Sequence, residues 1–176
     1  HNTFIGDSSG YTNSAGNNNT LLGYQAGYTN KGSRNTFIGT LSGYTNSTAE
    51  YNTFVGTYAG YTNTTGYNNT FIGDSAGFYN TVGIRNTFTG TSAGQKNVGG
   101  SNNTYLGYAT GSANTTGNNN TFFGYGSGNV LNGGSNNLFI GSYTGYSNTG
   151  GTGNVFLGFK AGYNETGSNK LYIDNS

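Results

Sequence analysis

The chain has 176 residues, of which only 6% are charged, and its formal net charge is +1. So few charges cannot form a basic face, so we expect no nucleic-acid partner. Cysteine is absent, which removes disulfides and thiolate metal sites. No apolar stretch approaches the length of a membrane span, and we expect no membrane insertion.

One sequence unit recurs along the whole chain. The second position of the unit can be identified in every copy. Of the ten intervals between successive second positions, eight are 17 residues long and two are 16. A fixed period of this size indicates a repeat architecture. We therefore predict a single domain, residues 1–176, made of ten coils and a half coil and forming a segment of a longer fibre. The residues at the second position are Thr3, Thr20, Thr36, Thr53, Thr70, Thr87, Thr104, Thr121, Leu138, Val155 and Leu171.

Each unit contains, in chain order, a run such as NTFIG, a second run such as AGYTN, and a looser loop. Glycine recurs at three fixed positions and marks corners where the backbone needs φ > 0 or close approach. Both runs are too short for a helix and are bounded by turn residues. We predict an all-β parallel β-solenoid, a β-roll with two short strands per coil and with the NTFIG strand as its spine. Ten coils would make a rod of about 48 Å.

Asparagine begins the unit in all ten full copies. In a solenoid these side chains stack, and each amide can bond to a carbonyl of the next coil. We predict a structural Asn ladder formed by Asn2, Asn19, Asn35, Asn52, Asn69, Asn86, Asn103, Asn120, Asn137 and Asn154.

The same asparagine-rich pattern also creates acceptor sequences for N-glycosylation. An Asn/Thr-rich repeat produces such sequences by chance, and we favour structural ladders over a row of glycans. The candidate acceptors are Asn18, Asn46, Asn63, Asn68, Asn102, Asn114, Asn119 and Asn164.

Side chains of the NTFIG run alternate between an aromatic row and an aliphatic row. A thin roll can enclose only one of these rows, so the other would form an exposed apolar stripe. We predict that the aromatic row is buried between chains, which makes a homotrimer or a filament of this chain the expected assembly. The predicted interface row is Phe4, Phe37, Phe54, Phe71, Phe88, Tyr105, Phe122, Phe139 and Phe156.

The unit N-T-F-I-G-x-x-A-G resembles the repeat arrays of bacterial surface proteins and phage tail fibres, and more distantly the head repeats of trimeric autotransporter adhesins. In such arrays the last repeat commonly ends in a segment similar to NKLYIDNS, which here covers residues 169–176. The resemblance spans the whole chain. It implies a left-handed β-roll in a homotrimeric fibre that is extracellular, on a cell surface or on a virion surface.

The sequence offers little for catalysis. Its single His is the first residue, so no Ser-His-Asp arrangement can be assembled. Asp7 and Asp74 share a position in the unit but lie four coils apart, about 19 Å, which is too far for a glycosidase pair. We expect no enzyme activity, no metal and no cofactor.

We therefore predict a structural extracellular fibre or adhesin shaft. An alternative is binding of a glycan or a surface receptor through exposed aromatic side chains. Ice binding by a Thr row is a third hypothesis, which Leu138, Val155 and Leu171 disfavour because apolar residues at that position suggest partial burial. The aromatic residues in question are Tyr24, Tyr58, Tyr108, Tyr125 and Tyr143.

Overall fold

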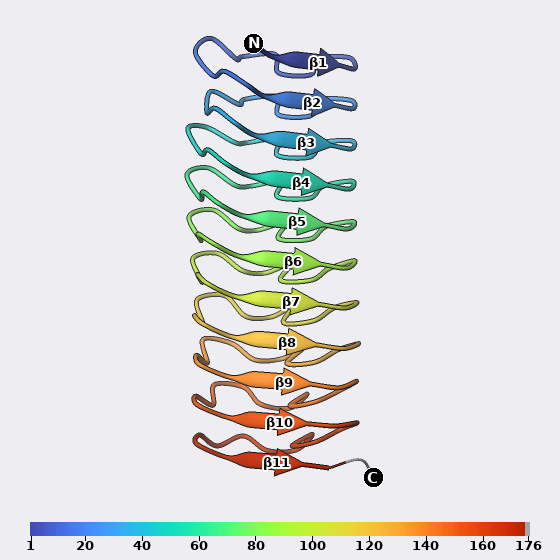
Figure 1. The fold of residues 1–176 in the computed structure, drawn as a ribbon, viewed down its shortest axis with the longest axis vertical. Helices are drawn as coiled ribbons and strands as arrows, with labels where there is room; N and C mark the ends of the chain where they lie inside the picture. The colour runs from blue at the N-terminus through green and yellow to red at the C-terminus, as the bar shows by residue number, and fades with distance from the viewer. Residues whose placement is uncertain (175–176) are drawn as a thin grey trace.

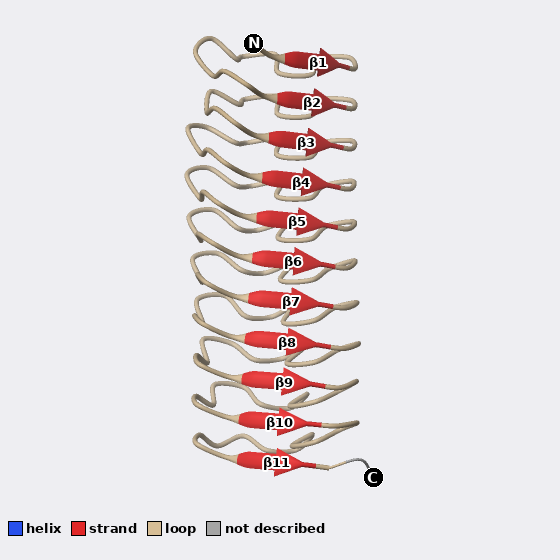
Figure 2. Ribbon diagram, in the orientation of Figure 1, coloured by secondary structure: helices blue, strands red, loops and turns tan. Residues whose placement is uncertain are grey.

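The computed structural model describes residues 1–174 and shows a straight stack of coils (Figure 1). Every coil contributes one three-residue strand, and the strands form a single parallel sheet in chain order (Figure 2). This architecture confirms the predicted parallel β-solenoid. Asn175 and Ser176, the end of the NKLYIDNS segment, lie outside the described residues. The strands are β1 (Thr3–Ile5), β2 (Thr20–Leu22), β3 (Thr36–Ile38), β4 (Thr53–Val55), β5 (Thr70–Ile72), β6 (Thr87–Thr89), β7 (Thr104–Leu106), β8 (Thr121–Phe123), β9 (Leu138–Ile140), β10 (Val155–Leu157) and β11 (Leu171–Ile173).

Neighbouring strands pair in register, so the same position of the unit repeats up the sheet. Phe54 of β4 lies beside Phe71 of β5, for example. The middle side chain of each strand points inward, and from Phe37 to Phe156 these rings form an unbroken stack with centroids 4.7–4.9 Å apart. Burying each ring contributes roughly 1.5–3 kcal/mol, and the stacking adds about 0.5–1.5 kcal/mol per pair.

The aromatic row therefore lies inside one chain, and the prediction that it forms an interface between chains is wrong. From Phe37 to Phe156 its members have no exposed surface, and only Phe4 in the first coil is partly exposed. The second repeated glycine is the reason. A Cβ on Gly60 would lie 2.4 Å from Phe54 Cε2, so the bare glycine backbone provides the slot in which the ring fits. The aliphatic row faces outward instead.

The second predicted strand does not form. The AGYTN segments are turns, although their backbones still bond from coil to coil, as Gly60 N does to Ala76 O at 2.9 Å. Gly60 has φ +60°, and Asn63 N closes a turn onto Gly60 O at 3.1 Å. A left-handed residue in the middle of the segment excludes the extended backbone that a strand needs.

Small side chains complete the interior opposite the rings. From the second coil onward, one buried residue per coil, such as Ala59, Ala76 or Ala93, precedes the second glycine. The core is therefore only one ring wide, and each coil is stabilised mainly by the coils above and below it.

Within the described residues there is no helix with the length and apolar character needed to cross a membrane.

Candidate functional site

The Asn ladder runs through the buried edge of the roll. In coil after coil the backbone N–H of one Asn donates to the side-chain oxygen of the previous one, as Asn69 N does to Asn52 Oδ1 at 2.9 Å. The Nδ2 group donates to the carbonyl of a repeated glycine one coil further on, as Asn69 Nδ2 does to Gly83 O at 2.8 Å. The ladder reaches Lys170, whose N–H donates to Asn154 Oδ1 at 2.8 Å. The predicted Asn ladder is confirmed, and nine of its ten members are 0–2% exposed.

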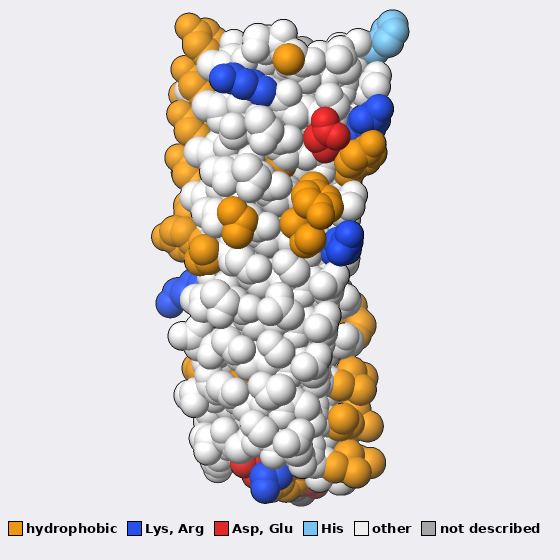
Figure 3. All heavy atoms as spheres, turned by 90° about the vertical axis from the view of Figure 1, so that its left-hand side faces the viewer, with side chains coloured by type: hydrophobic (Ala, Val, Ile, Leu, Met, Phe, Trp, Pro, Cys, Tyr) orange, Lys and Arg blue, Asp and Glu red, His pale blue; other side chains and the backbone are white. Residues whose placement is uncertain are grey.

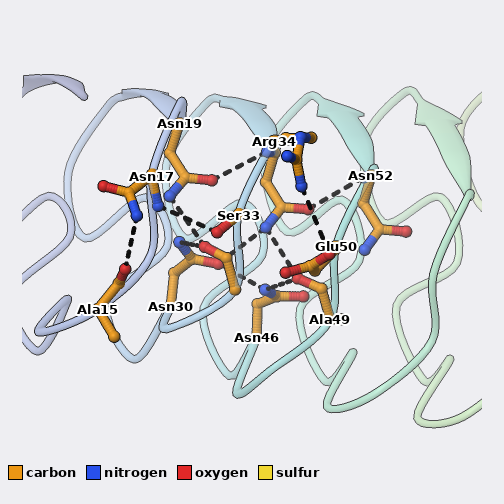
Figure 4. A network of polar contacts seen from close by, with 12 residues as sticks. Ala15, Asn17, Asn19, Asn30, Ser33, Arg34, Asn46, Ala49, Glu50 and Asn52 are labelled. Atoms are coloured by element: carbon orange, nitrogen blue, oxygen red, sulfur yellow. Dashed lines mark hydrogen bonds and ion pairs between the residues drawn. The ribbon is translucent and has the colours of Figure 1, made fainter. Parts of the chain in front are cut away.

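A second Asn ladder crosses the interior three residues after the second glycine. Asn46, Asn63, Asn80 and Asn97 each donate to the corresponding residue one coil earlier, at distances such as 2.8 Å for Asn80 Nδ2 to Asn63 Oδ1. Figure 4 shows part of both ladders near the N-terminus, with Asn30 and Asn46 in one and Asn19 and Asn52 in the other. The side chains that repeat most faithfully are therefore committed to holding adjacent coils together.

Burial separates the candidate glycosylation acceptors into two groups. Asn46, Asn63 and Asn114 are fully buried, so their amides cannot carry a glycan in the folded chain. For these three residues the structure contradicts glycosylation, because the amide is occupied in the interior. The exposed acceptors, which stay predictions, are Asn18, Asn68, Asn102, Asn119 and Asn164.

The outer face of the sheet carries two parallel rows. One contains the first strand residues, such as Thr20 and Thr87, and the other contains the third, such as Leu22, Ile72 and Ile140, each of the last three being 41% exposed. Leu138 and Val155 of the first row are half-buried, yet they lie on the same outer face as the threonines. The outer face is therefore a flat stripe in which one row is mostly hydroxylated and the other mostly aliphatic.

The tyrosines proposed for glycan binding do not form one platform. Tyr108 and Tyr125 stack at 5.1 Å, whereas Tyr143 meets Tyr125 edge to face and Tyr58 meets Tyr61 in the same way. A more regular column, Tyr11, Tyr28, Tyr44, Tyr61 and Phe78, is stacked ring on ring at 4.9–5.1 Å. Rings that cover each other's faces present only edges to a ligand.

A compact group of charged and aromatic side chains lies on the loop side, and the sequence analysis missed it. The Arg34 guanidinium lies 5.1 Å above the Tyr51 ring, and Arg34 Nη1 is 3.9 Å from Glu50 Oε2. Tyr67 lies one coil beyond Glu50, and the guanidinium of Arg85, from the coil after that, lies 5.9 Å from the Tyr67 ring centroid. Figure 3 looks onto this side, where red and blue side chains gather with orange ones over the N-terminal half. The sequence does carry a signal for this group, because these residues depart from the repeat pattern in neighbouring coils.

No group of three or more His, Cys, Asp or Glu side chains is placed to hold a metal ion among residues 1–174. Comparisons with known proteins found no matching family model, no similar curated protein and no similar solved structure. Function must therefore be argued from the geometry of this chain alone.

Proposed function

We propose that the chain is a shaft segment of an extracellular fibre or adhesin, on a cell or virion surface, and that it is a mechanical spacer without catalysis. The observation that carries this proposal is the Asn ladder, which bonds each coil to the next from Asn2 to Lys170. Buried amide ladders resist shear between coils because sliding one coil would leave several buried polar groups unpaired. A rod built in this way is stiff along its whole length.

The outer stripe supports assembly of several such rods. It is about 48 Å long and about 8 Å wide, or roughly 400 Å², a size at which exposed patches mark interaction sites. One such stripe is smaller than the ~800 Å² per partner of a stable two-chain interface. Three chains around one axis would let each rod contact two neighbours, so we favour a homotrimer, with lateral packing into a filament as the alternative.

Light scattering on the purified chain at micromolar concentration tests the assembly. We expect about three times the 18.3 kDa of one chain, and we expect substitution of Ile72, Leu106 and Ile140 by Lys to give monomers because three charges would be buried. As a matched control, Val82→Lys and Val98→Lys place lysines on exposed loop positions and should leave the assembly intact. A folded wild-type monomer would contradict the assembled shaft.

Ice binding is a second candidate because the Thr row does face outward, from Thr3 to Thr121. In that case the stripe would contact water, and the chain would work as a monomer. Inhibition of ice recrystallisation that disappears in Thr53→Lys and Thr70→Lys variants would favour this function over the shaft.

A further inference from the structure

The loop-side group departs from the repeat in a position where departure is costly. The residue before each ladder Asn from Asn19 to Asn154, and the residue before Lys170, has a left-handed backbone, with φ between 56° and 71°. Asn and Gly tolerate this conformation best, whereas larger residues are strained there. The position is Asn or Gly in seven coils, and the three exceptions, Arg34, Tyr51 and Arg85, fall within four consecutive coils. Within this column the larger residues are therefore confined to these coils, whereas a second left-handed column, which includes Leu41, Tyr58 and Tyr143, carries larger residues along the rod. The ten residues are Asn18, Arg34, Tyr51, Asn68, Arg85, Asn102, Asn119, Asn136, Gly153 and Asn169.

The preceding position departs in the same coils. Elsewhere its side-chain oxygen accepts a backbone N–H from the coil before, as Ser135 Oγ does from Asn118 N at 2.9 Å and Ser101 Oγ from Ile84 N at 3.1 Å. At this position three consecutive coils carry Glu50, Tyr67 and Ile84, and none of these side chains accepts such a bond.

Three backbone N–H groups therefore lack an acceptor. They belong to Ser33, Glu50 and Tyr67, each of which lies one coil before a side chain that does not accept, and none of them has a hydrogen-bond acceptor within residues 1–174. Amide groups without an acceptor at the surface are available to bind an anion or a hydroxyl oxygen.

A pocket of about 550 Å³ opens at the same place. It lies within the size range of small-molecule sites, about 300–1,000 Å³. Two segments of successive coils line it. The lining residues are Thr48, Ala49, Glu50, Tyr51, Thr65, Tyr67 and Asn68. Both tyrosines are exposed, at 51% and 39%. Figure 4 shows Arg34 and Glu50 together at this edge of the roll.

We propose that this pocket binds a saccharide that carries a carboxylate. The apolar faces of sugar rings pack on tyrosine, sugar hydroxyls suit the side chains of Thr48 and Thr65, and the carboxylate suits a guanidinium. Arg85 lies outside the lining, but its guanidinium is 5.9 Å from the centroid of the Tyr67 ring that lines the pocket. Arg34 is already paired with Glu50, whereas Arg85 has no acidic partner among the described residues, so we assign recognition of the anion to Arg85 at the rim of the pocket. Backbone N–H groups of Glu50 and Tyr67 supply further donors.

The site goes beyond the proposed shaft function and does not depend on assembly. It would fasten the rod to an acidic polysaccharide. In a trimer the same site would be presented three times, which would strengthen attachment to a polymer through its raised effective concentration.

The test uses three acidic probes on the intact chain: trigalacturonic acid, a glucuronate-containing tetrasaccharide and sialyllactose. Each is compared by NMR titration with its neutral counterpart, which is the methyl ester for the first two and lactose for the third. We expect at least one acid to bind, and its neutral counterpart to bind about tenfold more weakly, as for loss of one charge-assisted interaction.

The variants are chosen to restore the repeat, so they should not unfold the chain. Arg85→Asn and Tyr67→Ser introduce the usual residue of each position, and we expect each to weaken binding about tenfold with no loss of thermal stability. Lys96→Asn and Tyr125→Ser remove a cation and a ring elsewhere on the surface and should leave binding unchanged. Three results would overturn the proposal: no binding of any acid, equal binding of acids and neutral counterparts, or equal effects of Arg85→Asn and Lys96→Asn.

Discussion

Single residues decide how closely the coils approach. Gly56 has φ +134°, and a Cβ there would lie 2.5 Å from Gly73 O in the next coil. Gly66 has no such backbone requirement, yet its Cβ would lie 2.4 Å from Gly83 O. Gly56, the first repeated glycine of its unit, is therefore required both by its positive φ and by the lack of space for a Cβ. Gly66, the third, is required only by the lack of space. Both permit the spacing of about 4.8 Å that backbone bonding between coils requires.

Tyr105 is the one interior ring with a hydroxyl, and it interrupts the second Asn ladder. Asn114 Nδ2 donates to the Tyr105 hydroxyl at 2.6 Å and not to Asn97, whose Oδ1 is buried without a partner. Burial also raises the pKa of the Tyr105 hydroxyl above its usual range. An unpaired buried oxygen costs about 1–3 kcal/mol.

We therefore predict that Tyr105→Phe stabilises the chain. The freed Asn114 amide can donate to Asn97, and the gain should be about 1 kcal/mol, measured by thermal or denaturant unfolding. Tyr108→Phe removes an exposed hydroxyl three residues further along the chain, and it should change the stability little. A loss of stability in Tyr105→Phe would mean that the hydroxyl contact is worth more than a continuous ladder.

At the scale of an element, each strand is too short to be stable by itself. Three residues per strand make few bonds, so the ladder beside the sheet must supply part of the cohesion. Asn103 illustrates this: it donates through Nδ2 to Gly117 O at 2.8 Å and accepts from Asn120 N at 2.9 Å. The ladder thus ties each strand to the loop of one coil and to the backbone of another.

Replacing Asn103 with Ala should cost about 3 kcal/mol, because a buried N–H and a buried carbonyl lose their partners. Denaturant unfolding monitored by circular dichroism measures the change. The neighbouring exposed Asn102 provides the control, since Asn102→Gly keeps the left-handed backbone and should be nearly neutral. Equal losses at both positions would show that the ladder does not stabilise the rod.

At the scale of the whole molecule, the rod behaves as a row of nearly equivalent units. Each coil contacts only its neighbours, and stability is the sum of coil and interface contributions. The columns of rings, ladder residues and small residues continue across every junction in which the period is kept.

Deleting one whole period, residues 86–102, should therefore leave a folded rod shorter by about 5 Å. Arg85 would then precede Asn103, and Asn103 would bond to Asn69 in place of Asn86. Deleting only residues 86–93 would set ladder residues against rings and should abolish cooperative unfolding. Small-angle scattering and thermal melts distinguish the two deletions, and equal tolerance of both would contradict the columnar account.

The period, the solenoid and the Asn ladders could be predicted from sequence because each is a property of one column of identical residues. Other features could not. Alternation within the strand shows two apolar rows, but only the slot beside Gly60 decides that the ring of Phe54 turns inward and Val55 turns outward. The second strand was excluded by left-handed backbone at Gly60. The candidate pocket is lined by Tyr51 and Tyr67 from successive coils about 5 Å apart in rise, so it exists only after the coils have stacked.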